Sequence, residues 1–228
     1  GSSCGSAALT AACIVPFSLG SDTGDSVRKP ASFAGLVGFK PTWSRISRFG
    51  LFPFAPSLDH VGFFTRSVDD AAIILEAISG RDDKDSTSST RPVENYFEQA
   101  SQSVKGMKVA VINQIYNAVE DEVVKSTFIK SINCLKHKGV TVDFVDMDKD
   151  LLASILPTYF VISCAEATSN NANLDGIKFG PYYDGKTYQE VMSLARTKGF
   201  GEMIKRRFVF GSFALMRENQ NELFRRPQ

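Results

Sequence analysis

Two short loops rich in glycine and serine, near the start of the chain, constrain its fold more than any other feature. The first is Gly1-Ser2-Ser3-Cys4-Gly5-Ser6 and the second runs from Gly20 to Pro30. Glycine lets the backbone approach a ligand closely, and successive N–H groups in such a loop can point at one anion. A serine that attacks an acyl group needs that setting, because the reaction creates an oxyanion within about 3 Å of the attacking oxygen. We therefore expect the fold to bring together Ser2 and Ser26, which lie 24 positions apart.

Three other interpretations of these loops arise from the residues alone: plain turns, a phosphate cradle, or part of a Ser-His-Asp triad. Neither loop has the order GxxxxGK[ST], and no GxGxxG opens a helix, which disfavours the phosphate cradle. Of the two histidines, His137 lies between two lysines on a predicted helix end, and His60 follows Asp59 in a loop where a structural role is typical. Because neither histidine is a convincing partner for a serine, activation of the Ser-Lys type is the remaining option.

The two loops resemble those of the amidase signature family, whose motifs are GGSSGGS and GSDTGGSxRxPA. Further segments are similar to one branch of that family, the A subunits of glutamyl-tRNA(Gln) amidotransferases. These segments lie at residues 38–42, 45–50, 57–62, 163–170, 175–180 and 199–207. The similarity covers essentially the whole chain and is weakest over residues 81–158.

The resemblance implies a mechanism. The family nucleophile falls on Ser26, and a second serine, held in the family by a cis peptide bond, falls on Ser2. Ser26 is expected to attack a carboxamide while Ser2 relays its proton to a deprotonated lysine, which in the family lies upstream of residue 1. The oxyanion is expected at backbone N–H groups of the second loop, those of Thr23, Gly24, Asp25 and Ser26.

The resemblance also implies glutamine as the substrate. By motif alignment, Arg207 is expected to hold the substrate carboxylate, with Arg206 as second choice, and Tyr159 is expected to line the pocket. Adjacent helical positions point about 100° apart, so one arginine can face a pocket while its neighbour faces solvent. The acidic residue that holds the ammonium group in the family lies past residue 228.

Two positions depart from the family pattern: Asp25 and Cys4 stand where glycine is usual. A carboxylate turned inward would oppose an oxyanion, so we expect Asp25 to point toward solvent or toward Arg28 or Lys29. Cys4 is expected to be a small packing residue rather than an alternative nucleophile. Lys40 is expected to be structural, with backbone carbonyls as its partners.

The chain begins inside a motif and ends where the family continues, which predicts a single amidase-type domain over residues 1–228 that is truncated at both ends. The resemblance implies a glutaminase subunit that releases ammonia for the conversion of Glu-tRNA(Gln) to Gln-tRNA(Gln). Its expected partners are a kinase/transferase B subunit, which uses ATP and Mg and binds most of the Glu-tRNA(Gln), and a small C subunit. No cofactor is expected in this subunit. The expected location is the bacterial cytoplasm, or the mitochondrial matrix in a eukaryote.

Two alternative functions stay open at this point: a free-standing amidase of the same family, and a catalytically inactive fragment that acts only as a binding piece. The net charge of +1 argues against a large nucleic-acid footprint of the chain's own. No apolar run approaches about 18 residues, so no membrane span is expected. The four cysteines form no CxxC pair and no histidine has ligand spacing, so a metal site is not expected. Their scatter among apolar neighbours indicates a reducing compartment.

The order of predicted elements indicates an α/β fold, and the resemblance implies a mixed β-sheet covered by helices on both faces, incomplete in this chain. Ser67 with Asp70 predicts the start of a helix through Ile78, closed by Gly80. The apolar face expected for this helix consists of Ala71, Ile74, Leu75 and Ile78. A strand–helix–strand order over residues 108–145 predicts a parallel pair with a right-handed crossover. The apolar face expected for its helix consists of Val123, Val124, Phe128, Ile132 and Leu135. Helices are predicted over 6–13, 67–78, 120–138, 153–170, 188–196 and 201–216, strands over 36–39, 108–112 and 140–145, and a polar loop over 81–104.

Overall fold

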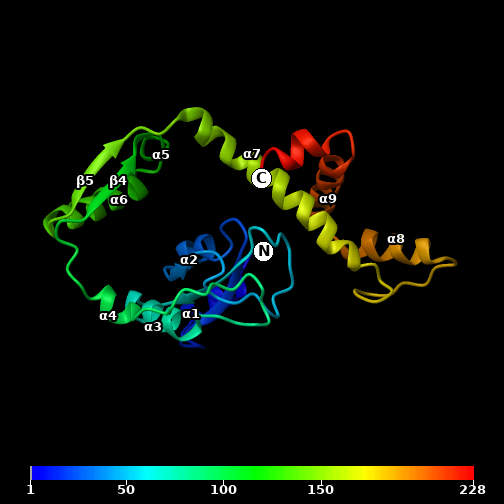
Figure 1. The fold of residues 1–228 in the computed structure, drawn as a ribbon, viewed down its shortest axis with the longest axis horizontal. Coiled ribbons are helices and arrows are strands. Elements are labelled where there is room, and N and C mark those ends of the chain that lie inside the picture. The colour runs from blue at the N-terminus through cyan, green and yellow to red at the C-terminus, as the bar shows by residue number, and fades with distance from the viewer. Residues whose placement is uncertain (1) are drawn as a thin grey trace. The chain divides into compact units, whose positions relative to one another are not determined.

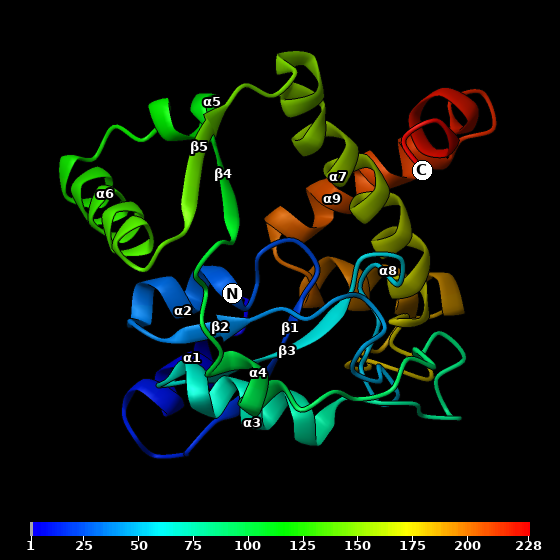
Figure 2. The ribbon, with the colours of Figure 1, turned by 60° about the vertical axis from the view of Figure 1, so that its left-hand side comes forward.

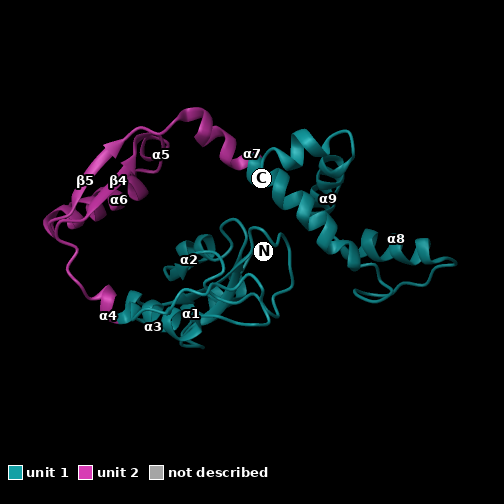
Figure 3. Ribbon diagram, in the orientation of Figure 1, with its two compact units in different colours: residues 1–97, 158–228 teal, residues 98–157 magenta. Residues whose placement is uncertain are grey.

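The computed structural model describes residues 2–228, which group into two compact units (Figures 1 and 3). Unit 1 combines the described residues up to Phe97 with Thr158–Gln228, and unit 2 is Glu98–Pro157. The single domain expected over residues 1–228 stays a prediction.

A three-stranded antiparallel sheet organises unit 1. Its strand order is β1 (Ser18–Asp22), β3 (His60–Thr65), β2 (Val37–Phe39), with Asp22 opposite His60 and Gly38 opposite Phe64. Successive side chains of a strand point to opposite faces of the sheet. The consecutive residues Phe63 and Phe64 are nonetheless both fully buried, because β3 is the central strand and each face of the sheet is covered.

Helices cover both faces of this sheet (Figure 2). On one face, Phe64 packs with Ala7 of α1 (Cys4–Ala11) and with Ala31 of α2 (Arg28–Ala34). On the other face, Phe63 packs with Ala71 of α3 (Val68–Ile78). The small side chains on α1 and α2 let these two helices lie close to the strands, which brings the chain segments at their N-terminal ends together.

Helix α3 begins and ends as predicted. The side chain of Ser67 accepts a hydrogen bond from the Asp70 N–H at 3.0 Å and caps the helix. Its predicted apolar face is confirmed, because the buried Ala71 and the half-buried Ile74, Leu75 and Ile78 all pack in the cluster around Phe63.

Unit 2 contains the predicted parallel pair, β4 (Lys108–Ile112) with β5 (Thr141–Val145). The connection includes α6 (Glu122–His137), which Asp121 caps by accepting from two backbone N–H groups. The predicted apolar face of α6 and strand β4 together line an open cavity of about 430 Å³, except that Val123 is 74% exposed and lies off this face.

Strands β1 and β3 and helix α2 were not predicted, because they lie in or beside segments interpreted as loops. Two shorter helices were also missed: α4 (Tyr96–Ala100), inside the segment expected to be a polar loop, and α5 (Asn113–Asn117). Each spans about one turn, too short for the 3.6-residue period of apolar positions to reveal it.

The remaining elements of secondary structure are all helical, and residues 174–187 between them form a loop. These elements are α7 (Lys149–Asn170), the 3₁₀ turn η1 (Asn171–Asn173), α8 (Tyr188–Gly199), α9 (Glu202–Leu215) and the π-helical segment η2 (Gln220–Arg225). Among the described residues, Lys149–Asn173 forms one helix long and apolar enough, by length and composition, to cross a membrane, which the sequence analysis did not anticipate. A core helix passes the same test, and residues 162–165 and 167 of α7 are buried inside unit 1.

Helices α7 and α9 pack at very close range through Gly211. A Cβ atom added to Gly211 would lie 2.1 Å from the Cys164 carbonyl oxygen and 2.2 Å from the Thr168 hydroxyl. Real Cβ atoms do not approach so closely, so this contact requires glycine. The Thr168 hydroxyl in turn lies within hydrogen-bonding distance of the Cys164 and Phe208 carbonyls, at 2.7 and 3.3 Å.

We therefore expect Gly211→Ala to lower the free energy of unfolding by about 1–3 kcal/mol, because a backbone carbonyl cannot move aside as a flexible side chain can. Gly5→Ala is the matched control, because Gly5 lies in α1 with nothing within 4 Å of an added Cβ. There alanine should be neutral or stabilising by up to about 1 kcal/mol. Urea unfolding of both variants measures the difference, and equal shifts of the midpoint would contradict the tight α7–α9 contact.

Candidate active site

The structure brings together the two serines that the sequence analysis selected. The Ser2 Oγ donates a hydrogen bond to the Ser26 Oγ at 3.3 Å, and the backbone N–H of Ser3 donates to the Ser26 carbonyl at 3.0 Å. Ser2 has a φ of 56°, in the left-handed region. None of the peptide bonds between described residues is cis, and the bond that precedes Ser2 involves Gly1, which lies outside them.

Ser3 has a different role from its neighbour. Its Oγ donates to the Ser21 carbonyl at 3.2 Å and accepts from the Ser21 N–H at 3.1 Å. It makes no side-chain hydrogen bond to the N-terminus of α1. A Cβ on Gly20 would lie 2.7 Å from the Ser3 Oγ, so glycine at that position admits Ser3 to the edge of β1. Ser3 thus fastens the first loop to β1, while the hydroxyl of Ser2 faces Ser26.

The second loop is folded around the buried carboxylate of Asp22, at the end of β1. This carboxylate accepts from the Val27 N–H at 3.1 Å and pairs with Arg28 Nε at 3.2 Å and Lys40 Nζ at 3.1 Å. Arg28 also donates to the Gly24 carbonyl. The partner of Lys40 is therefore a carboxylate rather than the backbone carbonyls we expected, because a buried charge requires a charged or hydrogen-bonding partner.

Burial alone would raise the pKa of Asp22. Hydrogen bonds from Arg28, from the Val27 N–H and from Lys40 outweigh burial and hold the pKa of this carboxyl below its usual range. Asp22 is therefore ionised at neutral pH, and its charge is matched by two cations.

A second buried carboxylate, Asp59, holds the other side of the loop. One of its oxygens accepts from the Thr23 hydroxyl at 2.5 Å, and the other accepts from the N–H groups of Phe54 and Ala55 at 2.8 and 3.0 Å. No motif in the sequence predicts this role for Asp59, because the local signal is only an acidic residue just before an apolar strand.

His60 has a structural position, in line with the interpretation from the sequence. Its Nδ1 lies 2.6 Å from the Leu58 carbonyl oxygen, and His60 pairs with Asp22 across β1 and β3. Burial lowers the pKa of His60, which favours the neutral ring.

Asp25 points away from the loop interior toward Lys29, one of the two cations we expected. Its carboxylate pairs with Lys29 Nζ at 2.6 Å. Arg28, the other candidate, is engaged by Asp22. Cys4 is exposed, so the expected packing role is wrong for the chain as described, since no neighbouring element covers its side chain.

Tyr159 of α7 lies against the second loop. A Cβ on Gly24 would lie 2.8 Å from the Tyr159 hydroxyl oxygen. Gly24 does not have a positive φ. Glycine is therefore required there for the close approach of Tyr159 rather than for an unusual backbone conformation.

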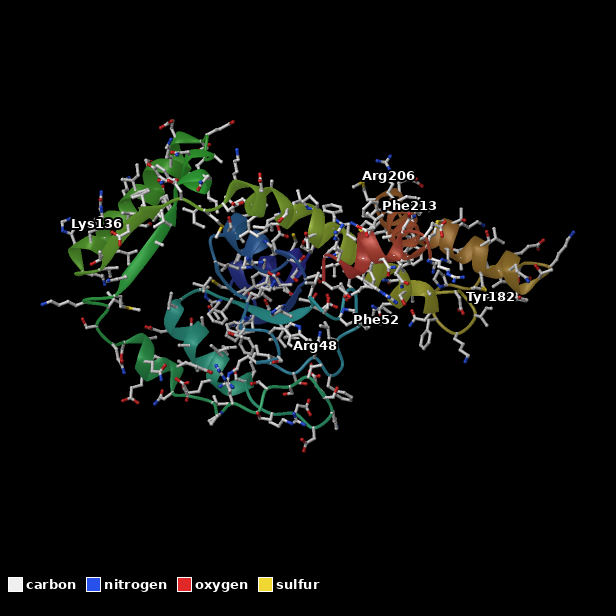
Figure 4. The ribbon with its side chains drawn as sticks, turned by 45° about the horizontal axis from the view of Figure 1, so that its top comes forward. Arg48, Phe52, Lys136, Tyr182, Arg206 and Phe213 are labelled. Atoms are coloured by element: carbon white, nitrogen blue, oxygen red, sulfur yellow. The ribbon has the colours of Figure 1, made fainter. Side chains whose placement is uncertain are left out.

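The two candidate arginines differ in their surroundings. Arg207 is half-buried, with its guanidinium 5.1 Å from the centre of the Phe160 ring. Arg206 is exposed and projects outward from α9 (Figure 4). In the part of the chain that the structure describes, no carboxylate forms an ion pair with Arg207. Arg207 is therefore the better placed of the two to receive an anion.

The charge of Arg207 also affects the pKa of Cys164 in α7. Burial raises the pKa of the Cys164 thiol, and the Arg207 charge opposes this effect without cancelling it. The thiol is thus protonated at neutral pH.

An open cavity of about 610 Å³ reaches the first loop. It is lined by Ser2 and Ser3 together with residues of β1, β3 and the 46–51 segment. The described residues contain no group of three or more His, Cys, Asp or Glu side chains placed to hold a metal ion. The Ser26 hydroxyl is hydrogen-bonded to a second serine and lies in a loop with backbone N–H groups nearby, while the buried carboxylates are paired with cations or hydrogen-bond donors. Such an arrangement is suited to attack on an acyl group.

Comparison with known proteins identifies the family. The sequence model of the family described as Amidase matches residues 1–228. The chain belongs to the amidase family. It is 43% identical over 229 residues to the A subunit of glutamyl-tRNA(Gln) amidotransferase from Geobacillus stearothermophilus, covering 100% of this chain and 47% of that protein. It is also 43% identical over 218 residues to the A subunit of the same enzyme from Sulfurihydrogenibium sp. (strain YO3AOP1), covering 94% of this chain and 44% of that one.

Solved amidase-family structures share the fold. The crystal structure of the Thermotoga maritima glutamyl-tRNA(Gln) amidotransferase A subunit matches with a TM-score of 0.73 and 38% identity, over 98% of this chain and 43% of that one. The native peptide amidase from Stenotrophomonas maltophilia matches in fold with a TM-score of 0.74 at 23% identity, over 98% of this chain and 45% of that one. The chain thus spans about half the length of the relatives it matches. The predicted family and α/β fold class are confirmed, with the strands of the described residues in two sheets.

We expect Asp22→Asn to lower the free energy of unfolding at pH 7 by about 3 kcal/mol, because it removes the buried partner of two cations. The folded-state pKa of Asp22 lies below its unfolded value, so its stabilisation is full above the unfolded pKa and disappears as the pH falls through the folded-state pKa. The difference between wild type and variant should therefore shrink in acid.

Urea unfolding at a series of pH values measures this difference. Asp83→Asn is the control, because Asp83 is an exposed partner of Arg81 and should matter little at any pH. A gap between wild type and Asp22→Asn that stayed constant into strong acid would contradict the role of the Asp22 charge.

Proposed function

We propose that the chain carries the nucleophile loops of a glutamine-hydrolysing subunit of a tRNA-dependent amidotransferase. The complete enzyme would release ammonia from glutamine for the conversion of Glu-tRNA(Gln) to Gln-tRNA(Gln). The observation that carries the proposal is the 3.3 Å hydrogen bond between Ser2 and Ser26 within an amidase-family sequence. The similarity to relatives named as the A subunit of glutamyl-tRNA(Gln) amidotransferase, over the whole chain, supports this branch of the family.

In the proposed reaction, the Ser26 Oγ attacks the side-chain carboxamide carbon of glutamine. The new C–O bond forms as the hydroxyl proton passes to Ser2 and on to a base, for which the family uses a lysine upstream of residue 1. A hydroxyl both donates and accepts, so the Ser2–Ser26 bond can reverse its direction. The oxyanion would be held by backbone N–H groups of residues 23–26. The C–N bond then breaks, ammonia leaves with the returned proton, and water hydrolyses the ester to glutamate.

The surroundings of Tyr159 and Arg207 support glutamine as the substrate. Consecutive residues of α7 reach two parts of the proposed pocket: the Tyr159 hydroxyl lies at Gly24, and the Phe160 ring lies under the Arg207 guanidinium. A half-buried guanidinium without a carboxylate partner suits a free carboxylate, because its fork of donors matches the two oxygens. We propose that the amide end of glutamine lies at Ser26 and its α-carboxylate at Arg207.

The partners are also part of the proposal. The names of the relatives designate one lettered subunit of an amidotransferase, which supports a multi-subunit assembly. We propose a kinase/transferase B subunit that uses ATP and Mg, a small C subunit, and no cofactor in this subunit. The B subunit would bind most of the Glu-tRNA(Gln), since this chain has a net charge of only +1. The proposed location is the bacterial cytoplasm, or the mitochondrial matrix in a eukaryote.

A free-standing amidase is less well supported. The 6-aminohexanoate cyclic dimer hydrolase, an enzyme of the same fold, is 25% identical, against 38% for the Thermotoga maritima A subunit. An inactive binding piece is disfavoured by the intact Ser2–Ser26 pair.

In the complete amidotransferase, Ser26→Ala should lower glutamine hydrolysis at least about a thousandfold, because it removes the nucleophile. Transfer that uses free ammonia should be unaffected. Mass spectrometry of trapped enzyme should find the acyl group on Ser26 alone, since Ser2 only relays a proton.

Ser3→Ala is the matched control for this prediction, because the Ser3 side chain forms its hydrogen bonds with Ser21 and not with the Ser26 side chain. Hydrolysis by Ser26→Ala at a near wild-type rate would refute the assignment. An acyl group on Ser2 would reverse the two roles.

Arg207→Lys should lower kcat/KM for glutamine about tenfold to a hundredfold, because a point-charge ammonium cannot reproduce a bidentate fork. No loss is expected with ammonia as the nitrogen donor, since ammonia has no carboxylate. Steady-state kinetics with both donors test this, with Arg206→Lys as the control. Equal losses with both donors would indicate a folding role for Arg207, and a loss confined to the Arg206 variant would assign the carboxylate to Arg206 instead.

A further inference from the structure

The loop that carries Ser26 contains two carboxylates, Asp22 and Asp25, and two cations, Arg28 and Lys29. A third cation, Lys40, reaches the loop from the end of β2. Asp22 pairs with Arg28 and Lys40 at 3.2 and 3.1 Å, and Asp25 pairs with Lys29 at 2.6 Å. Arg28 and Lys40 are both engaged by Asp22, so Lys29 is the cation that balances the Asp25 carboxylate.

Asp25 is the residue next to the nucleophile, at a position where the family motif has glycine. A carboxylate turned into the loop at this position would lie close to the oxyanion that forms when Ser26 attacks, and like charges at such range repel. The structure contains a compensation for this departure. The Asp25 carboxylate is drawn out of the loop onto Lys29, which lies four residues later on the first turn of α2.

Lys29 also lies near the proposed substrate pocket. Asp25 raises the pKa of Lys29 through a hydrogen bond and through its charge, and Tyr159 adds a smaller effect in the same direction. Lys29 is therefore charged at any working pH, and its neighbouring charged and polar side chains include Asp25 and Tyr159.

We propose that Lys29 is a positioning residue for acyl transfer, which holds the Asp25 carboxylate away from the oxyanion and cancels its charge. The inference rests on the proposed acyl-transfer function. Aspartate replaces the glycine of the family motif at position 25. Its carboxylate is therefore compatible with acyl transfer only when a cation lies four residues later.

A plain surface ion pair is the competing explanation. The side chains of Lys29 and Asp25 are 58% and 48% exposed, and exposed pairs contribute little to stability. The two explanations differ in what removing Asp25 does. If Lys29 acts by neutralising Asp25, it becomes dispensable once Asp25 is glycine.

The test compares wild type, Lys29→Ala, Asp25→Gly and the double variant in the complete enzyme. We expect Lys29→Ala to lower kcat for glutamine about fivefold, with little change in KM because Lys29 does not touch the substrate. The double variant should recover to within about twofold of wild type, and Lys29→Arg should retain activity. Added salt should slow the wild type more than Asp25→Gly, because an exposed pair is screened. Arg226→Ala is the matched control, since it breaks another exposed i,i+4 pair, with Glu222, far along the sequence.

A second readout is independent of glutamine. A fluorophosphonate probe phosphonylates the nucleophilic serine: the Oγ–P bond forms, fluoride leaves, and the hydroxyl proton goes to the base. The rate of labelling should be lower for Lys29→Ala than for wild type and should recover in the double variant, because negative charge develops on the phosphoryl oxygen. If labelling follows this order while no variant hydrolyses glutamine, the proposed substrate is wrong and the role of Lys29 holds.

Equal losses in Lys29→Ala and in the double variant would overturn the inference and assign Lys29 a structural role. A wild-type rate for Lys29→Ala in both readouts would also overturn it. Thermal unfolding of each variant shows whether a loss of rate reflects a loss of folded protein.

Discussion

The buried carboxylate of Asp22 is the interaction on which the candidate site depends. A charge at the end of β1, out of contact with water, must be matched by donors and cations, and these come from Val27, Arg28 and Lys40. Because the Val27 N–H and the Arg28 side chain must reach this carboxylate, the chain after β1 turns back on itself. That turn presents Ser26 to the first loop, so the electrostatic requirement of one side chain sets the geometry of the proposed nucleophile.

The sheet beneath the loops explains why they meet. The central strand β3 buries Phe63 on one face and Phe64 on the other, and α1 and α2 share the Phe64 face through Ala7 and Ala31. Small side chains at those two positions allow close packing on the strands. The first loop precedes α1 and the second precedes α2, so packing the two helices together brings their preceding loops together.

Local signals in the sequence were sufficient for much of the secondary structure. The Ser67 cap and the apolar face of α3 predicted that helix, and the strand–helix–strand pattern predicted the parallel pair in unit 2. These features depend on residues close together in the chain, where propensity and periodicity act. Strands β1 and β3, helix α2, the one-turn helices α4 and α5 and the first residues of α7 were missed, because these segments give no clear periodic signal.

The sequence by itself determined the two loops, the 24-residue spacing of Ser2 and Ser26, and the family to which they belong. Tertiary structure decided which neighbours these residues have. The bond from Thr23 to Asp59 and the approach of Tyr159 to Gly24 join positions far apart in the chain. Such contacts have no local signal, because they depend on how the β-sheet, its loops and α7 pack against one another.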